Sequence, residues 1–357
     1  MRVHRTLTLA LSQKERVKKR TEESHWMLPC SWCSNINSLR FVSALFVLCC
    51  WPNLAAAQLR NVRACTPGLS PSFTYLNVAQ ERGFFAQEKL HVEILAARGQ
   101  LCITALIAEQ ISFTTNPTAF DLMVDGKIKG KVLYNAAKGV SHRLIVAPGI
   151  KSYADLKGKL IAISTFGGFA DKLTREILAQ HGLQAMKDVM LLQIGTADLR
   201  YASLRTNKVQ GALLVGHYAT TAVDEGHREL EYESPPYISG PMSTLDSTLA
   251  RDRAMVTSFV RGVIKGHLFF RQKPEQAVAI MQKALRLDDK KLAAQLHKDE
   301  MRRYNAGGQL DESYLKRVID RARDDSIAKR ELDIKELFDF SIAKEVEVEL
   351  KRAQWNP

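Results

Sequence analysis

The chain lacks the sequence motifs of several large enzyme classes. None of its 357 residues belongs to a Gly-x-Ser-x-Gly, His-Glu-x-x-His or Gly-x-Gly-x-x-Gly motif. Each of those motifs places a nucleophile, metal ligands or a pyrophosphate, so their absence argues against a serine hydrolase, a zinc protease and a dinucleotide-binding enzyme. The glycine-rich segment at residues 165–169 is not followed by Gly-Lys-Ser/Thr, so it is not a Walker loop. The chain also contains no internal repeat and no low-complexity segment.

The apolar run at residues 41–51 is too short to cross a bilayer as a helix. It follows Arg40 and precedes Ala55-Ala56-Ala57, an arrangement typical of a secretory signal peptide. We therefore predict that residues 1–57 are a leader cleaved near Ala57, with Met27 as a candidate start. An uncleaved membrane anchor is the alternative. No Leu-small-small-Cys box ends the run, so a free periplasmic protein is favoured over a lipid-anchored one.

Cysteine is scarce after the leader, where only Cys65 and Cys102 remain. In an oxidising compartment these two could form a disulfide, and two separate buried thiols are the alternative. The seven histidines after the leader show no metal-ligand spacing with Cys, Asp or Glu. We therefore expect no metal and no other cofactor.

Acidic residues are outnumbered by basic ones. The whole chain has a formal net charge of +13, and the part after residue 57 has 43 Lys and Arg against 35 Asp and Glu. This excess is not concentrated in one block, so we expect no nucleic-acid partner. The charge fits an anionic ligand, but only weakly.

Short β-rich runs alternate with amphipathic helical patterns up to residue 215, which predicts βαβ units and parallel sheets. Ser152-Tyr153-Ala154-Asp155 is a capping box, and the pattern from Asp252 onward is helical. The predicted strands are residues 59–64, 91–95, 111–114, 131–135, 159–164, 189–194 and 211–215. The predicted helices include residues 73–82, 101–108, 117–125, 169–181, 197–206 and 334–352.

Two segments carry a resemblance to a known family. Residues 79–93 read A-x-E-x-G-F-F-x-x-E-x-L-x-V-E, and residues 152–163 read S-x-x-D-L-K-G-K-x-I-A-I. The first combines a helix that ends at Gly83, two aromatic residues and an alternating strand. The chain thus resembles the periplasmic substrate-binding proteins of the alkanesulfonate, nitrate, taurine and thiamine-precursor group. Those proteins capture a small solute and deliver it to an ABC transporter.

The resemblance covers essentially the whole mature chain and implies a fold. It implies an α/β protein with two lobes, the type II periplasmic binding fold, and a ligand cleft between them. Lobe one would comprise residues 58–146 plus 244–357, with the C-terminal helices packed on it, and lobe two residues 147–243. The chain would cross between lobes near Ala147-Pro148 and again near Gly240–Leu245. The partners implied are a small-molecule ligand and an ABC transporter permease in the inner membrane, and we expect a periplasmic monomer.

Ligands of open α/β sheets bind beyond the carboxyl ends of strands, where helix N-termini offer unpaired N–H groups. We therefore expect the ligand at the strand-to-helix loops of both lobes. In lobe one the candidates are Ser70, Ser72, Phe73, Gly99, Gln100, Thr114, Thr115 and Asn116. In lobe two they are Thr165, Phe166, Gly167, Gly168 and Phe169, followed by Gly216, His217 and Tyr218. The pair of glycines at 167–168 would let the backbone approach a ligand, with aromatic cover on either side; a tight turn with core-packing phenylalanines is the alternative.

Arg98, Lys138 and Arg143 are candidates for pairing with an anionic ligand. Each could instead be an ordinary solvated surface charge. His217 could respond to ligand charge, and a surface-loop histidine is the alternative. Together these residues favour a carboxylate- or sulfonate-bearing ligand.

The predicted function is solute binding by hinge closure for an ABC importer, with no enzymatic activity. A periplasmic sensor or partner-binding protein that uses the same fold is the alternative. Fungal thiamine-pyrimidine synthases share the first signature, but they carry a cysteine-rich cluster that this chain lacks. The effector lobes of bacterial transcription regulators share the fold, but they need an N-terminal helix-turn-helix where this chain has its leader.

Overall fold

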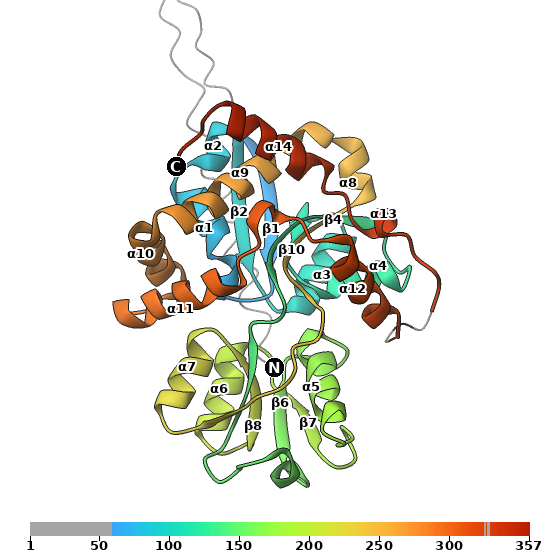
Figure 1. Cartoon of the computed structure of the whole chain (residues 1–357), viewed down its shortest axis with the longest axis vertical. Helices are drawn as coiled ribbons and strands as arrows, with labels where there is room; N and C mark the ends of the chain where they lie inside the picture. Colours follow the sequence, from blue (N-terminus) through green and yellow to red (C-terminus); the bar gives the residue numbers. More distant parts are fainter. Residues whose placement is uncertain (1–58, 325, 327–328) are drawn as a thin grey trace, which may run out of the picture. The chain divides into compact units, whose positions relative to one another are not determined.

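The computed structural model of the chain describes residues 59–324, 326 and 329–357, so the predicted leader lies outside the described residues. These residues form two five-stranded sheets, each covered by helices on both faces (Figure 1). All described residues fall within a single unit of the chain.

The first sheet has the strand order β2-β1-β3-β10-β4. Its strands are β1 (Arg60–Thr66), β2 (Leu90–Ala96), β3 (Phe113–Thr114), β4 (Gly130–Lys138) and β10 (Ile238–Leu245). β1 is parallel to both β2 and β3, whereas β10 is antiparallel to β3 and β4.

The second sheet has the order β7-β6-β8-β5-β9. Its strands are β5 (His142–Val146), β6 (Leu160–Ile163), β7 (Met190–Gln193), β8 (Gly211–Val215) and β9 (Arg228–Leu230). β6 is parallel to β7 and β8, and β5 is antiparallel to β8 and β9. The two sheets therefore share one plan, with three parallel strands extended by antiparallel ones.

Helices cover the first sheet on both sides. One face carries α1 (Thr74–Glu81), α2 (Phe84–Gln87), α9 (Arg253–Gln272), α10 (Pro274–Leu285), α11 (Lys290–Arg303) and α14 (Ser341–Arg352). The other face carries α3 (Gly99–Ile107), α4 (Thr118–Val124), α12 (Glu312–Asp324) and α13 (Ile334–Leu337). α8 (Asp246–Arg251) follows β10 directly, and short 3-10 turns lie at Pro71–Phe73, Tyr153–Leu156 and Ala306–Gly308.

The second sheet carries α5 (Phe169–Gln180) on one face and α6 (Ala197–Arg205) with α7 (His217–Asp224) on the other. Each predicted strand is present, and so are the predicted helices, with ends displaced by a few residues, except that the helix expected at residues 334–352 is divided into α13 and α14. The capping box is confirmed, since the backbone N–H of Ser152 donates to Asp155 over 2.9 Å. The predicted fold class is also confirmed, because the chain forms two α/β lobes and α14 packs on the first.

The connections between the sheets lie at positions other than those expected from the sequence. Residues 142–146 pair with β8 and β9 of the second sheet, and Ile238–Leu245 pairs with β3 and β4 of the first. The sheets are therefore joined through residues 139–141 and 231–237, whereas the resemblance implies crossings near Ala147-Pro148 and near Gly240–Leu245. The turn at Ala147-Pro148 marks the end of β5, and long-range strand pairing, invisible in the local pattern, decides which sheet β5 joins.

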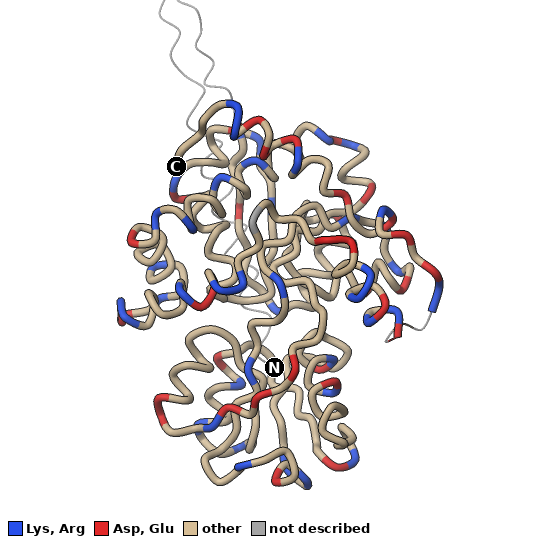
Figure 2. The backbone as a smooth tube through the Cα atoms, viewed as in Figure 1, with Lys and Arg blue, Asp and Glu red and all other residues tan. Residues whose placement is uncertain are grey.

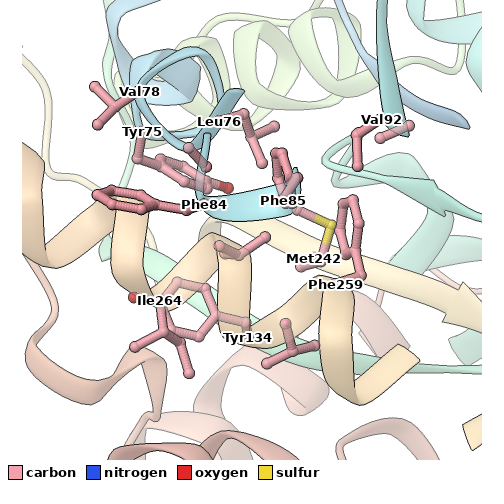
Figure 3. Packing of buried hydrophobic residues seen from close by; sticks show 14 of the residues in the cluster. Tyr75, Leu76, Val78, Phe84, Phe85, Val92, Tyr134, Met242, Phe259 and Ile264 are labelled. Carbon is pink, nitrogen blue, oxygen red and sulfur yellow. The ribbon is translucent and has the colours of Figure 1, made fainter. Parts of the chain in front are cut away.

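The Gly-Phe-Phe segment of the first signature belongs to the core of the first lobe (Figure 3). Phe84 and Phe85 are buried against α9, and Phe85 stacks on Phe259 with ring centroids 5.2 Å apart. Phe113 of β3 also stacks on Phe259, with ring centroids 3.8 Å apart. Ile342 of α14 belongs to the same cluster, so the C-terminal helix completes a core that the first signature begins. None of the described helices is both long and apolar enough to cross a membrane.

Cys65 and Cys102 form a disulfide, which settles the alternative that the sequence left open. Cys65 lies within β1 and Cys102 within α3, and both side chains are buried. The bond joins the strand that precedes residues 67–73 to the helix that follows residues 97–98. It therefore fastens two neighbouring loops of the first lobe.

Removing the disulfide should lower the stability of the protein. The two cysteines are 37 residues apart, and closing a loop of that size in the unfolded chain corresponds to about 4 kcal/mol. We expect Cys65→Ala/Cys102→Ala to lose about that much free energy of unfolding in urea titrations. The wild-type protein unfolded in the presence of a reductant is the control. An unchanged midpoint in both would contradict this role.

Candidate functional site

A cavity of about 610 Å³ lies between the two lobes. Loops that follow β1, β2 and β3 line it from the first lobe, and loops that follow β6, β7 and β8 line it from the second. The connection at residues 139–141 and the start of β10 close one side. The cleft is therefore bounded by the carboxyl ends of the parallel strands of both sheets, where open α/β sheets bind ligands.

Eleven of the sixteen predicted site residues line this cleft. They are Ser70, Ser72, Phe73, Gly99, Gln100, Asn116, Thr165, Gly168, Phe169, His217 and Tyr218. Their individual roles in binding remain predictions.

The lining of the first lobe is held by hydrogen bonds between its loops. The side chain of Asn116 donates to the carbonyl of Gly99 over 2.9 Å and accepts from the backbone N–H of Thr118 over 3.1 Å. The hydroxyl of Ser70 accepts from the N–H of Ser72 over 3.3 Å. These contacts and the nearby disulfide fix the loops before any ligand arrives.

Two predicted residues of the first lobe do not line the cleft. Thr114 is buried within β3, where its hydroxyl donates to the carbonyl of Cys65 over 3.0 Å and accepts from the N–H of Asn116 over 3.2 Å. Thr115 is also buried and outside the lining. Thr114 therefore supports Asn116 instead of facing a ligand.

Three predicted residues of the second lobe are also outside the lining. Phe166 is 48% exposed, and its N–H is bonded to the side chain of Gln193 over 3.0 Å. The N–H of Gly167 donates to Asp171 over 2.8 Å. The glycine loop therefore turns these two residues away from the cleft and presents Thr165, Gly168 and Phe169.

Gly216, the third predicted residue outside the lining, allows the two lobes to approach closely. It has φ of +58°, and a Cβ added there would lie 2.6 Å from Cδ of Pro71 in the first lobe. Only glycine fits this combination of conformation and contact. His217 and Tyr218 then begin α7, so they lie at a helix N-terminus directly after β8.

Two of the three predicted cations are paired with other side chains. Lys138 is 3.1 Å from Asp311, and Arg143 contacts Glu229 at 2.5 Å. Neither lines the cleft, whereas Arg98 does. Basic and acidic residues are interspersed over both lobes (Figure 2), so a lone surface charge carries little information about function.

Sequence reasoning missed Arg200, a cleft residue on α6 that is only 4% exposed. Its Nε donates to the carbonyl of Leu213 over 2.9 Å and its Nη1 to the carbonyl of Gly195 over 2.5 Å. Burial lowers its pKa to about 10, while Asp198 acts in the opposite direction. The available signal was its position four residues before Leu204, which puts an arginine on the buried face of this helix.

Ion pairs join the lobes beside the cleft. Lys172 of α5 donates to Asp121 of α4 over 2.9 Å. Arg321 of α12 lies 3.6 Å from Asp121 and 3.8 Å from Glu176 of α5. The Arg321 guanidinium also stacks 3.5 Å over the ring of Tyr237, in the second connection between the sheets. These largely buried contacts stabilise the present arrangement of the lobes.

A second polar cluster joins α11 and the start of β10 to the loop that carries Ser72. Arg303 of α11 donates to Ser239 over 3.1 Å and to Ser72 over 3.2 Å. Glu300 pairs with Arg303 at 2.5 Å and accepts from Ser72 over 3.0 Å. Ser72 and Ser239 both line the cleft, so this cluster supports the first-lobe side of the site.

Two histidines of the cleft are held neutral. Burial, followed by the nearby charges of Arg200 and Arg303, lowers the pKa of His142 to about 3. Burial also lowers the pKa of His217. The Nδ1 atoms of both have no hydrogen-bond partner among the described residues. Each ring therefore retains a nitrogen that can hydrogen-bond to a ligand.

The depressed pKa of His142 predicts a loss of stability in acid. The unfolded chain takes up a proton near the ordinary pKa of 6.5, whereas the folded protein does so only near 3. The free energy of unfolding should therefore fall as the pH drops below 6.5, by up to about 1.4 kcal/mol per pH unit for this residue. His267, which is buried in the first lobe and has a pKa of about 3, should likewise lower the free energy of unfolding as the pH falls.

We expect His142→Gln to make the free energy of unfolding less dependent on pH between pH 6 and 4, by the slope that corresponds to about one proton. Urea unfolding at each pH measures this slope. His91→Gln, at an exposed position of β2, is the matched control. A pH slope identical to that of the wild type would contradict the burial of a neutral His142.

No group of three or more His, Cys, Asp and Glu residues within the described part of the chain could hold a metal ion. The family model described as NMT1/THI5 like matches residues 70–277. No curated protein matches the chain.

Solved structures share the fold at low sequence identity. A protein from Bordetella bronchiseptica RB50 has a TM-score of 0.72 at 14% identity, over 82% of this chain and 98% of its own. The periplasmic aliphatic sulphonate binding protein SsuA from Escherichia coli has a TM-score of 0.59 at 15% identity, over 80% and 99%. The periplasmic nitrate-binding protein NrtA from Synechocystis PCC 6803 has a TM-score of 0.64 at 13% identity, over 82% of this chain and 90% of its own. The predicted group and its type II periplasmic binding fold are thereby confirmed.

Proposed function

The chain belongs to the NMT1/THI5-like family, and from this premise we propose that it is the solute-binding component of an ABC importer in the periplasm. The observation that carries the proposal is the cleft of about 610 Å³ between two lobes that are joined by only two connections. This volume lies within the range of small-molecule sites, about 300–1,000 Å³. The cleft has loops, helix N-termini and neutral polar groups, which suit capture and release of a solute.

The proposed mechanism is a two-state clamp. A solute first meets the lobe-one loops, which carry Ser72, Asn116 and Gln100. Rotation about residues 139–141 and 231–237 then brings Phe169, His217 and Tyr218 over it. Closure is favourable only to the extent that the ligand makes contacts in the closed state that it lacks in the open state. The closed form is the one that a permease would recognise.

The ligand we propose is a small organic anion with a carboxylate or sulfonate group. Its apolar part would lie against aromatic side chains of the lining, which include Phe73 and Phe169. The test is a thermal-shift screen of ligand-freed protein against nitrate, sulfonates, carboxylates and thiamine precursors. A ligand that binds only the folded state raises the melting temperature by mass action. No shift with any solute would reject solute binding and favour a sensor or partner-binding role.

The two phenylalanines of the glycine loop provide a matched pair of variants. Phe169 lines the cleft and packs against Tyr237, whereas Phe166 is outside the lining. With any solute that the screen identifies, we expect Phe169→Ala to weaken binding by roughly tenfold, as for the loss of a large apolar contact. Phe166→Ala should change affinity less than twofold. Isothermal titration calorimetry measures both, and equal effects of the two changes would contradict the placement of this loop.

A further inference from the structure

Arg200 carries a buried charge for which the protein supplies no ion-pair partner among the described residues. Two of its five N–H donors are bonded to the carbonyls of Gly195 and Leu213. Asp198, at the exposed start of α6, is the nearest acidic influence, but it forms no ion pair with Arg200. A buried charge is normally paired, because leaving it unpaired costs several kcal/mol.

A second guanidinium approaches the same point from the opposite lobe. A Cβ added to Gly195 would lie 3.8 Å from Nε and 4.0 Å from Cζ of Arg98. Arg98 has no carboxylate partner within the described parts of the chain either, and it lines the cleft. Guanidinium groups from both lobes thus lie near Gly195, and an anion bound there would be offered N–H donors from each lobe.

The surroundings of Gly195 suit an anion. The N-termini of α5 and α6, helices of twelve and nine residues, both open onto the cleft there. Their first-turn N–H groups and the hydroxyls of Ser164, Thr165 and Thr196 are donors. The carboxylate of Asp198 is the one lining group that opposes a negative ligand.

We infer that the acidic group of the ligand binds between Arg98 and Arg200 beside Gly195 and bridges the two lobes. This inference rests on the proposed function and specifies where the charge of the ligand lies. Arg200 is fixed in the second lobe by its two carbonyl contacts, whereas Arg98 belongs to a loop of the first. An anion held by one of these arginines therefore contacts the other only when the lobes approach, and this additional contact favours the closed state.

The test compares variants in their response to anions and to uncharged analogues of similar shape. The probes are inorganic sulfate, benzenesulfonate and benzoate, with benzenesulfonamide and benzamide as uncharged partners. Ligand-freed wild-type protein should be stabilised by at least one anion and not by its uncharged partner at equal ionic strength. We expect Arg98→Gln and Arg200→Gln each to weaken that anion roughly 10- to 100-fold, the range for loss of a charge-assisted hydrogen bond.

Arg205→Gln is the matched control, because Arg205 lies on the same helix, is exposed and pairs with Glu225. Arg98→Gln keeps the inference testable if Arg200→Gln fails to fold, since Arg98 is exposed and its side chain makes no hydrogen bond within the described part of the chain. If the anion bound Arg98→Gln or Arg200→Gln with wild-type affinity, the inference would be overturned. Selective stabilisation by uncharged solutes would overturn it and leave the proposed function intact. No stabilisation by any solute, here or in the wider screen, would overturn both.

Discussion

The chain passes between its two sheets twice, and the rest of the structure depends on this constraint. Both sheets are covered by helices on both faces, so their strands are buried and offer no surface to a ligand. What remains free is the edge at the carboxyl ends of the parallel strands. The double connection through residues 139–141 and 231–237 turns these two edges toward each other, and the cleft is the space between them.

The two sides of the cleft are built differently. In the first lobe, the disulfide and the side chains of Thr114 and Asn116 tie neighbouring loops together. In the second lobe, three helices begin at the cleft, and Arg200 joins the loop after β7 to strand β8. In the proposed mechanism, a preformed surface on each side lowers the entropy lost on binding, so closure would be the main rearrangement that a ligand drives.

The segment that most resembles the family does not line the cleft. The Gly-Phe-Phe signature packs in the core of the first lobe with α9 and α14, two helices that lie far from it in the sequence. Cores constrain sequence through shape and volume, so they keep a resemblance that surface loops lose. The residues that would select a solute lie in those loops. This explains why the signature predicts the fold but leaves the ligand to the geometry of the cleft.

Short-range patterns in the sequence determined the helices, most strands, the capping box at Ser152 and the loops that could face a ligand, because periodicity and capping act within a few residues. Tertiary structure alone decided the sheet to which β5 belongs, the pairing of Cys65 with Cys102 and the burial of Thr114. It also decided that Phe166 turns outward and that Arg98 and Arg200 converge on Gly195. Each of these depends on which distant segments meet. Such meetings are set by the packing of the whole chain, and no local run of residues encodes them.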